Sequence, residues 1–122
     1  MSADQPLIES RVDLSAVRVV MVQQLWRQPE LSDVEAATMA ALERTGALER
    51  ITSGDEIAIT AGSRGIATLP AVLRTVVRAV RDRGGKPFVF PAMGSHGGGT
   101  ADGQRALLAD LGIDEQTIGA PI

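Results

Sequence analysis

The chain has no cysteine, a single histidine and only three aromatic side chains among its 122 residues. Without cysteine it can form no disulfide, no thiolate metal site and no cysteine nucleophile. The one histidine, His96, cannot complete an ordinary zinc site by itself. Because aromatic residues make up only 2% of the chain and apolar residues 44%, the core has to be built from Val, Leu, Ile and Ala.

Clustered positive charge and long apolar runs are also missing. The net charge is -3, and the eleven arginines and the one lysine, Lys86, are spread along the chain, whereas a nucleic-acid surface usually needs a basic patch. No apolar stretch approaches the roughly 20 residues of a membrane span. The first six residues lack the basic start and apolar run of a signal peptide. We therefore expect a cytoplasmic protein without a nucleic-acid or membrane partner.

Strand-like and helix-like patterns alternate from residue 17 onward. Short apolar runs predict strands over 17–22, 56–61 and 87–90. Capping residues and apolar periodicity predict helices over 32–43, 68–83 and 100–111. This βαβαβα order predicts an α/β fold with an open, mainly parallel sheet and right-handed crossovers. We expect residues 1–15 to be a poorly ordered lead-in and residues 16–122 to form one α/β domain.

The helix predicted over 68–83 has the clearest signal. One apolar stripe recurs with helical spacing, formed by Leu69, Val72, Leu73, Val76, Val77 and Val80. Thr68 is the predicted N-cap of this helix, and Ser32 with Glu35 has the form of a capping box on the first helix. Gly112 is predicted to end the last helix in a left-handed conformation.

Two similar glycine-rich loops follow the second and third predicted strands. A shift of 32 residues places 61–68 on 93–100, and two glycines, a serine and a threonine coincide. That spacing is close to one strand–helix unit, although the ordinary chemistry of βα loops can produce the same similarity. Because parallel strands end at the same sheet edge, where open α/β sheets bind ligands, Arg64 and His96 are expected to face one crevice.

Arg64 and His96 would offer a ligand a permanent cation and an imidazole, the side chain that changes charge near neutral pH. This pair suits an anionic substrate that undergoes proton transfer. The amides of a glycine-rich turn before a helix can also bind an anion. Simpler interpretations exist: His96 as a solvated loop histidine, Arg64 as the partner of a helix carboxylate, and Ser63 and Ser95 as turn formers.

Three familiar site patterns are missing from the two loops. Neither loop carries an acidic residue that could orient His96, so a serine–histidine–acid triad is not supported. The phosphate loop G-x-x-x-x-G-K-[ST] requires a lysine that does not precede Thr100, and G-x-G-x-x-G is not present. An enzyme, a non-catalytic module that binds phosphate or carboxylate, and a purely structural domain all remain open.

The amino-acid sequence of these loops resembles that of the nickel-dependent lactate racemase family, and more narrowly that of the amino-terminal domain of its uncharacterised members. The resemblance covers roughly residues 16–122 and rests on 61–67, Pro87–Phe88, 91–98, Gln104 and Leu111–Gly112–Ile113. The family's most specific loop reads glycine, threonine, histidine, arginine, proline, any residue, threonine. Gly94, His96 and Thr100 match it in register, with Ser95 in place of the threonine.

The resemblance implies a two-domain enzyme whose active site lies in the cleft between the domains. The family's cofactor is a nickel pincer nucleotide, and a small 2-hydroxy acid is racemised through hydride transfer and a planar 2-keto acid. His96 falls on the acid/base histidine, and Arg64 on the arginine that binds the substrate carboxylate. Ser63 and Ser95 are expected beside the substrate. The expected cofactor contacts are Gly62, Gly65, Gly94, Gly97, Gly98 and Thr100.

The chain departs from the family pattern at three places. The family has an aspartate where this chain has Ala61, a proline where it has Gly65, and arginine–proline where it has Gly97–Gly98. The family's cofactor-tethering lysine and nickel-ligand histidine lie further along the chain, and His96 is the only histidine here. We therefore expect an amino-terminal part of a longer enzyme that is inactive alone, holds no metal, and forms homo-oligomers through an uncovered apolar face.

Overall fold

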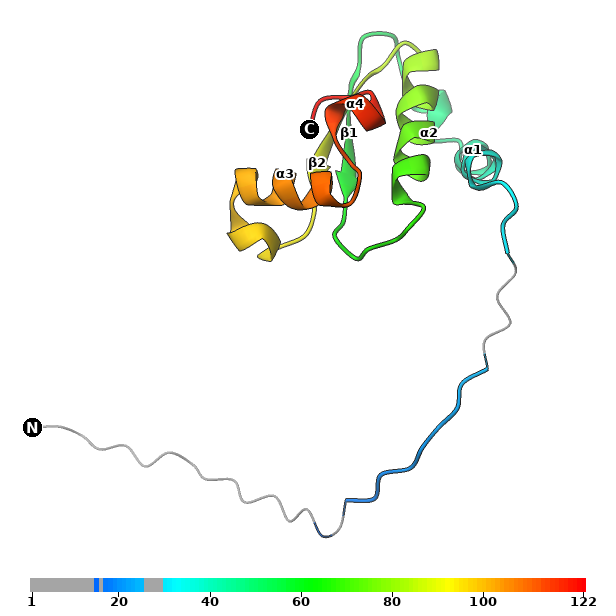
Figure 1. The fold of residues 1–122 in the computed structure, drawn as a ribbon. Helices are drawn as coiled ribbons and strands as arrows, with labels where there is room; N and C mark the ends of the chain where they lie inside the picture. The colour runs from blue at the N-terminus through cyan, green and yellow to red at the C-terminus, as the bar shows by residue number, and fades with distance from the viewer. Residues whose placement is uncertain (1–14, 16, 26–29) are drawn as a thin grey trace, which may run out of the picture.

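The computed structural model describes residue 15, residues 17–25 and residues 30–122. In chain order its elements are α1 (Val34–Thr45), η2 (Leu48–Arg50), β1 (Glu56–Ala61), α2 (Leu69–Asp82), β2 (Lys86–Pro91), η3 (His96–Gly99), α3 (Ala101–Asp110) and α4 (Glu115–Ile118). Figure 1 shows α2 beside the two strands, with α1 on one side of α2 and with α4 and α3 on the opposite side of α2 from α1. The three predicted helices form, whereas the short helix α4 has no counterpart in the prediction.

The sheet consists of β1 and β2, which lie parallel and in register from Glu56–Lys86 to Ala61–Pro91. Helix α2 connects them, so this part of the chain is one βαβ unit. The predicted strands at 56–61 and 87–90 are therefore confirmed, as is the mixed α/β character of the fold. The complete alternating order is not confirmed, because the sheet has two strands.

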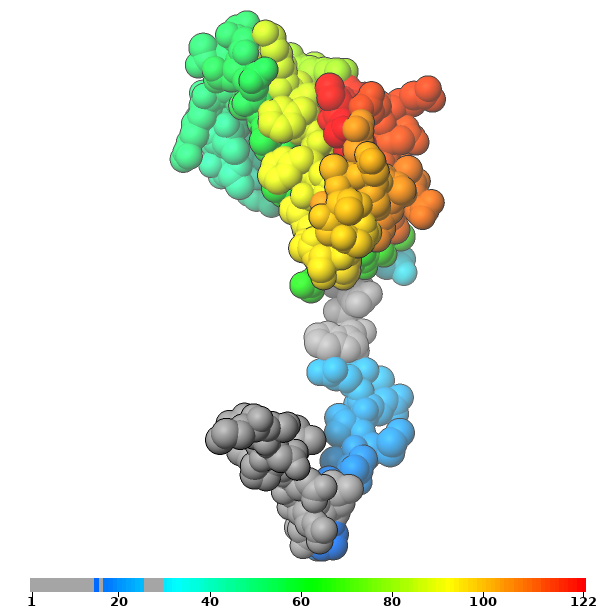
Figure 2. Space-filling model, turned by 90° about the vertical axis from the view of Figure 1, so that its left-hand side faces the viewer, coloured from blue at the N-terminus to red at the C-terminus, as the bar shows by residue number. Residues whose placement is uncertain are grey.

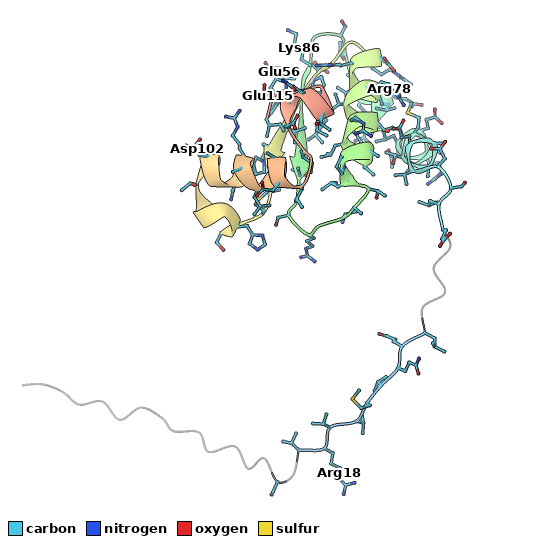
Figure 3. All side chains as sticks on the ribbon, viewed as in Figure 1. Arg18, Glu56, Arg78, Lys86, Asp102 and Glu115 are labelled. Carbon is cyan, nitrogen blue, oxygen red and sulfur yellow. The ribbon has the colours of Figure 1, made fainter. Side chains whose placement is uncertain are left out.

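The strand predicted over 17–22 does not form. Residues 17–25 belong to no helix or strand, and Val19 and Met21 are 87% and 99% exposed. Figures 1 and 3 show this segment, with Arg18 labelled, extending away from the folded body. Its β-branched residues favour a strand only where a neighbouring strand pairs with the backbone, and none does here. Most of the predicted lead-in and Trp26 lie outside the described residues.

The core lies on one face of the sheet. Ala61 and Val89 point from the strands toward α2, and the buried side chains around them are Leu73, Val77, Leu108, Ile113, Ile118 and Ala120. The predicted stripe of α2 is confirmed in its central positions. Thr75 is also buried, because its hydroxyl donates a hydrogen bond to the carbonyl of Ala71 at 3.0 Å.

The other face of the sheet has no covering layer among the described residues. Phe88 and Phe90 project from β2 on this face, remain 38% and 41% exposed, and have ring centroids 6.5 Å apart. Figure 2 shows the face, with β2 in yellow. The chain thus forms a sheet with all of its described helices on one side.

Two of the predicted helix-capping residues are confirmed and two need correction. Asp33, not Ser32, caps α1, because its carboxylate accepts a hydrogen bond from the Ala36 amide at 2.8 Å. Thr68 precedes α2 as predicted, but its side chain makes no capping hydrogen bond. Thr100 caps α3 as predicted, and Gly112 has the predicted left-handed φ of 75°.

Candidate functional site

The two glycine-rich loops lie side by side at the carboxyl ends of β1 and β2. The parallel register brings Ala61 opposite Pro91, and the Ala92 amide donates a hydrogen bond to the Ala61 carbonyl at 2.7 Å. The loops are therefore joined where they leave the sheet. The prediction that they share one sheet edge is consistent with this geometry.

A side-chain hydrogen bond joins the first loop to the only histidine. The Ser63 Oγ lies 2.5 Å from the His96 Nδ1, although the two residues are 33 positions apart. A serine hydroxyl can donate or accept, so it can pair with either neutral tautomer of the ring. Because Nδ1 is engaged by Ser63, Nε2 is the ring nitrogen left for a ligand.

The loop that carries His96 is fastened to α3 from two sides. The Gln104 side-chain amide donates a hydrogen bond to the Gly94 carbonyl at 2.7 Å. The Thr100 hydroxyl donates to the Gly97 carbonyl at 3.2 Å and accepts from the Gly103 amide at 3.1 Å. The backbone of Gly97 and that of Gly103 approach so closely that a Cβ on either would overlap the other.

Left-handed backbone conformations shape this loop. Gly94, Gly97, Gly98 and Gly99 have φ values of 62°, 62°, 69° and 67°. Side chains with a Cβ rarely adopt this region, so the sequence of glycines is required by the path of the chain. Through these four glycines the backbone passes around His96 and into the start of α3.

A cavity of about 390 Å³ lies between the two loops. Its polar lining is provided by Ser63, Arg64 and His96, and its remaining walls by Gly62, Ile66, Leu69, Ala92 and Met93. No carboxylate lines it. Arg64 is exposed and has no hydrogen bond or ion pair within the part of the chain that the structure describes. The cavity is therefore positive in character, which suits a small anion.

Not all predicted site residues line this cavity. Gly62, Ser63, Arg64 and His96 do, whereas Ser95, Gly65, Gly94, Gly97, Gly98 and Thr100 stand in the surrounding loops. Gly94, Gly97 and Thr100 support the His96 loop through the contacts to α3. The supporting role of Gly103 was not predicted, although a glycine inside a helix often marks a close backbone approach.

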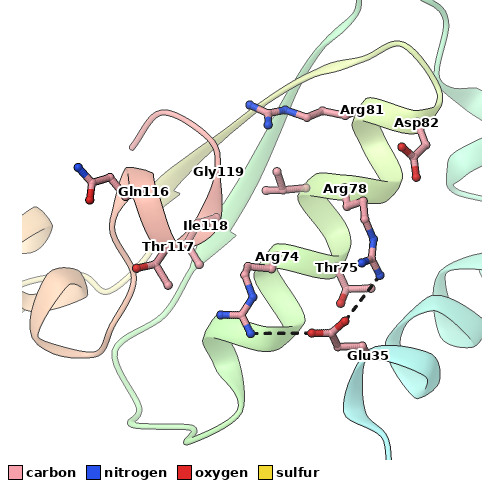
Figure 4. Close-up of a pocket in the computed structure, with 11 residues that line it drawn as sticks. Glu35, Arg74, Thr75, Arg78, Arg81, Asp82, Gln116, Thr117, Ile118 and Gly119 are labelled. Atoms are coloured by element: carbon pink, nitrogen blue, oxygen red, sulfur yellow. Dashed lines mark ion pairs between the residues drawn. The ribbon is translucent and has the colours of Figure 1, made fainter.

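A second cavity, of about 330 Å³, lies between α1, α2 and α4 and is shown in Figure 4. Glu35 of α1 faces two arginines of α2 there, with its oxygens 3.8 Å from Arg74 and 3.7 Å from Arg78. Arg81 extends away from Glu35 in the same view. All three paired side chains are substantially exposed, so each pair contributes little stability and mainly orients α1 on α2.

The described residues do not fit a nickel centre. They contain no group of three or more histidine, aspartate, glutamate or cysteine side chains that could hold a metal ion. The cavity offers one imidazole, one guanidinium and one hydroxyl, which are donors for an anion rather than a ligand set for a cation.

Among the described residues, no helix combines the length and apolar character needed to cross a membrane. A scan of protein-family models, a search of curated proteins and a search of solved structures each found no match to this chain.

Proposed function

We propose that this chain is the substrate-binding and acid/base part of a cytoplasmic 2-hydroxy acid racemase or epimerase of the lactate-racemase type. The observation that carries the proposal is the Ser63–His96 hydrogen bond, which leaves Nε2 of the ring available in a cavity shared with Arg64. The full βαβαβα order belongs to the same proposal, with residues 17–22 supplying a strand that this structure does not form.

His96 is the proton acceptor in this proposal. With Nδ1–H donating to the Ser63 Oγ, Nε2 carries the lone pair that a general base needs. Nε2 takes the proton of the substrate 2-hydroxyl, and the imidazolium that results still donates from Nδ1 to Ser63. Inversion also requires the α-hydrogen to leave as hydride and to return to the opposite face, a step that His96, Ser63 and Arg64 do not perform. The proton then returns from Nε2 to the 2-oxygen. Ser63 is thus a positioning residue for the ring.

Arg64 is the substrate's anchor. Its planar guanidinium can bind a carboxylate through two parallel hydrogen bonds, which fixes the orientation of the acid as well as its position. No carboxylate of the protein lines the cavity to compete for it. The apolar side chains of Ile66, Leu69 and Met93 line the part of the cavity that would face the rest of the substrate.

The nickel pincer nucleotide that the family resemblance implies finds no ligand set in the described residues. No step given for His96, Ser63 or Arg64 passes through nickel. Under this proposal the cofactor and the hydride step belong to residues outside this chain, so the chain by itself binds substrate without converting it.

A second candidate is a module that binds carboxylate or phosphate without chemistry. The positive, acid-free lining of the cavity favours it equally. The two candidates differ in what they require of the ligand. A racemase site must contact the 2-hydroxyl through His96, whereas an anion module needs only the negative group.

The decisive experiment titrates the isotopically labelled chain with lactate, propionate and inorganic phosphate and follows the His96 ring nitrogens by NMR. Propionate is lactate without its hydroxyl. We expect lactate to bind about two- to tenfold more tightly than propionate, the value of one hydrogen bond, and to shift the Nε2 signal. His96→Gln is expected to bring the affinity for lactate down to that for propionate.

Ser63→Ala and Ser95→Ala form a matched pair for this experiment, since in the described part of the chain the Ser63 side chain forms a hydrogen bond with the His96 ring and the Ser95 side chain does not. Ser63→Ala is expected to weaken the preference for lactate, and Ser95→Ala to leave it unchanged. Equal binding of all three anions, with no response of Nε2, would reject the racemase site and support the anion module. No binding of any anion would reject both.

A further inference from the structure

The outer edge of β1 has no neighbouring strand within the part of the chain that the structure describes. The sheet order is β1–β2, so half of the backbone N–H and C=O groups of β1 point away from the ladder. An apolar groove of about 410 Å³ follows this edge, lined among others by Ile57, Ile59, Leu42 and Leu48. An unpaired edge beside an apolar groove can accept an added strand.

We propose that residues 17–22 of the same chain add to this edge as a parallel strand, and that docking brings residues 23–25 to the carboxyl edge of the sheet. Five apolar side chains in this segment are 56–99% exposed, namely Val17, Val19, Val20, Met21 and Val22. Four of them are valines, and β-branched residues are enriched in strands. The segment therefore exposes apolar side chains that match the apolar lining of the groove.

The handedness of crossovers fixes which edge such a strand uses. Helices α1 and α2 lie against each other, and both border the groove beside Ile57 and Ile59, so they cover the same face of the sheet. Strand–helix–strand connections between parallel strands are right-handed in nearly all proteins. With both helices on one face, the step from a preceding strand to β1 runs in the same direction as the step from β1 to β2. The strand before α1 therefore belongs on the free edge of β1.

Side-chain alternation fixes its orientation. In a strand, Val17, Val19 and Met21 share one face, and Arg18 and Val20 share the other. The charged Arg18 belongs on the open face, so Val17, Val19 and Met21 point toward the helices and the groove. By the same alternation, Val20 lies in the docked strand on the exposed face of the sheet, which also carries Phe88 and Phe90.

The connection is long enough. The chain from Val22 to Val34 can span up to about 40 Å, well beyond the sheet-to-helix spacing of about 10 Å.

A parallel strand over 17–22 ends at the same edge as β1, so Gln23 and Gln24 arrive beside the Gly62–Gly65 loop. Their side-chain amides can donate hydrogen bonds to an anion held there. This inference concerns the fold of the chain and does not depend on the proposed chemistry.

The test compares two substitutions of the same kind at adjacent positions in the full chain, Val19→Lys and Val20→Lys. Amide hydrogen exchange is followed by NMR in the absence of any ligand. In the wild type we expect the amides of 17–22 to exchange at least about tenfold more slowly than an unpaired segment, and cross-strand contacts to β1. Val19→Lys should abolish this protection, whereas Val20→Lys should keep it. The amides of α2 serve as the internal control for an intact fold.

Three results would each overturn the proposal. The first is rapid exchange of the 17–22 amides in the wild type, and the second is an equal effect of the two lysine substitutions. The third is protection that appears only at high protein concentration together with a dimeric mass, because the added strand would then come from a second copy.

Discussion

Gly103→Ala tests how firmly α3 holds the loop that carries His96. In an exposed helix this change ordinarily stabilises a protein by about 1 kcal/mol, since alanine is the better helix former. Here the new Cβ would lie only 1.9 Å from the Gly97 carbonyl oxygen and 2.8 Å from its carbonyl carbon. Both neighbours are backbone atoms, so no change of rotamer can relieve the overlap.

The loop has to move by more than 1 Å, because carbon and oxygen atoms in contact are normally at least about 3.3 Å apart. Overpacking of this kind costs about 1–3 kcal/mol. The movement also strains the hydrogen bonds from Thr100 to Gly97 and from Gln104 to Gly94, which contribute about 1 kcal/mol each. These losses exceed the gain in helix propensity, and we expect a net destabilisation of about 1–3 kcal/mol.

Urea denaturation measures the change in the free energy of unfolding, and NMR reports the environment of His96. The control is Gly62→Ala in the first loop, where an added Cβ meets nothing within 4 Å and φ is not in the left-handed region. It should change stability by less than about 0.5 kcal/mol. A Gly103→Ala protein that is more stable than the wild type, with the His96 signals unmoved, would refute the argument.

Three further predictions concern the support of the same region. Leu108→Ala, at a fully buried position of α3, is expected to lower the free energy of unfolding by about 2–5 kcal/mol, whereas Ala109→Gly on the exposed side of the helix should cost about 1 kcal/mol, both measured by urea denaturation. Thr100→Ala should cost about 1 kcal/mol through loss of the α3 cap, while Thr100→Ser should retain most of the stability and the His96 signals; equal losses would show that the hydroxyl does not cap. At Asp114, hydrogen bonds from the backbone and side chain of Thr117 lower the pKa of the carboxyl group, so its ionised form is favoured in the folded state. A lowered folded pKa gives stability that is present above the unfolded pKa of about 3.9 and is lost as the pH falls through the folded value. The wild type should therefore exceed Asp114→Asn in stability at neutral pH, and the difference should shrink below pH 4 in denaturation experiments; a difference independent of pH would contradict the assignment.

The local elements of this chain could be predicted because their signals are local. The periodicity of Leu73, Val77 and Val80 determines which side of α2 is buried, and the β-branched run at 56–61 forms the strand it indicates. The run at 17–22 is also rich in β-branched residues, but a strand needs a neighbouring strand to pair with, and the sequence of the segment alone does not specify that partner. The cap of α1 is Asp33 and not the predicted Ser32, because both residue types can cap a helix and they occupy adjacent positions in the sequence.

The position of the candidate site could be predicted from the sequence, but the contacts that hold its residues in place could not. Alternation of strands and helices places Arg64 and His96 at one sheet edge, since parallel strands end together. The contact between Ser63 and His96 depends on rotamers and on the exact register of β1 and β2, which the sequence does not specify. The close approach of Gly97 to Gly103 is a tertiary contact of the same kind.

The two similar loops are held to the fold differently, and under the proposed function this difference suits them to different roles. The His96 loop is held by the Thr100 cap, the Gln104 amide and the Gly97–Gly103 contact. Among the described residues, the first loop has fewer contacts to its following helix: Thr68 makes no capping hydrogen bond, and a Cβ at Gly62 or Gly65 would meet nothing within 4 Å. Proton transfer requires the acceptor nitrogen within hydrogen-bond reach of the hydroxyl, so it benefits from the fixed loop. A carboxylate clamp tolerates adjustment, because a guanidinium on a long side chain can follow its ligand. If the proposed function holds, addition of a 2-hydroxy acid should shift the NMR signals of the backbone around Arg64 and leave those of the backbone around His96 in place, and the Ser63–His96 hydrogen bond should carry the adjustment of the first loop to the ring.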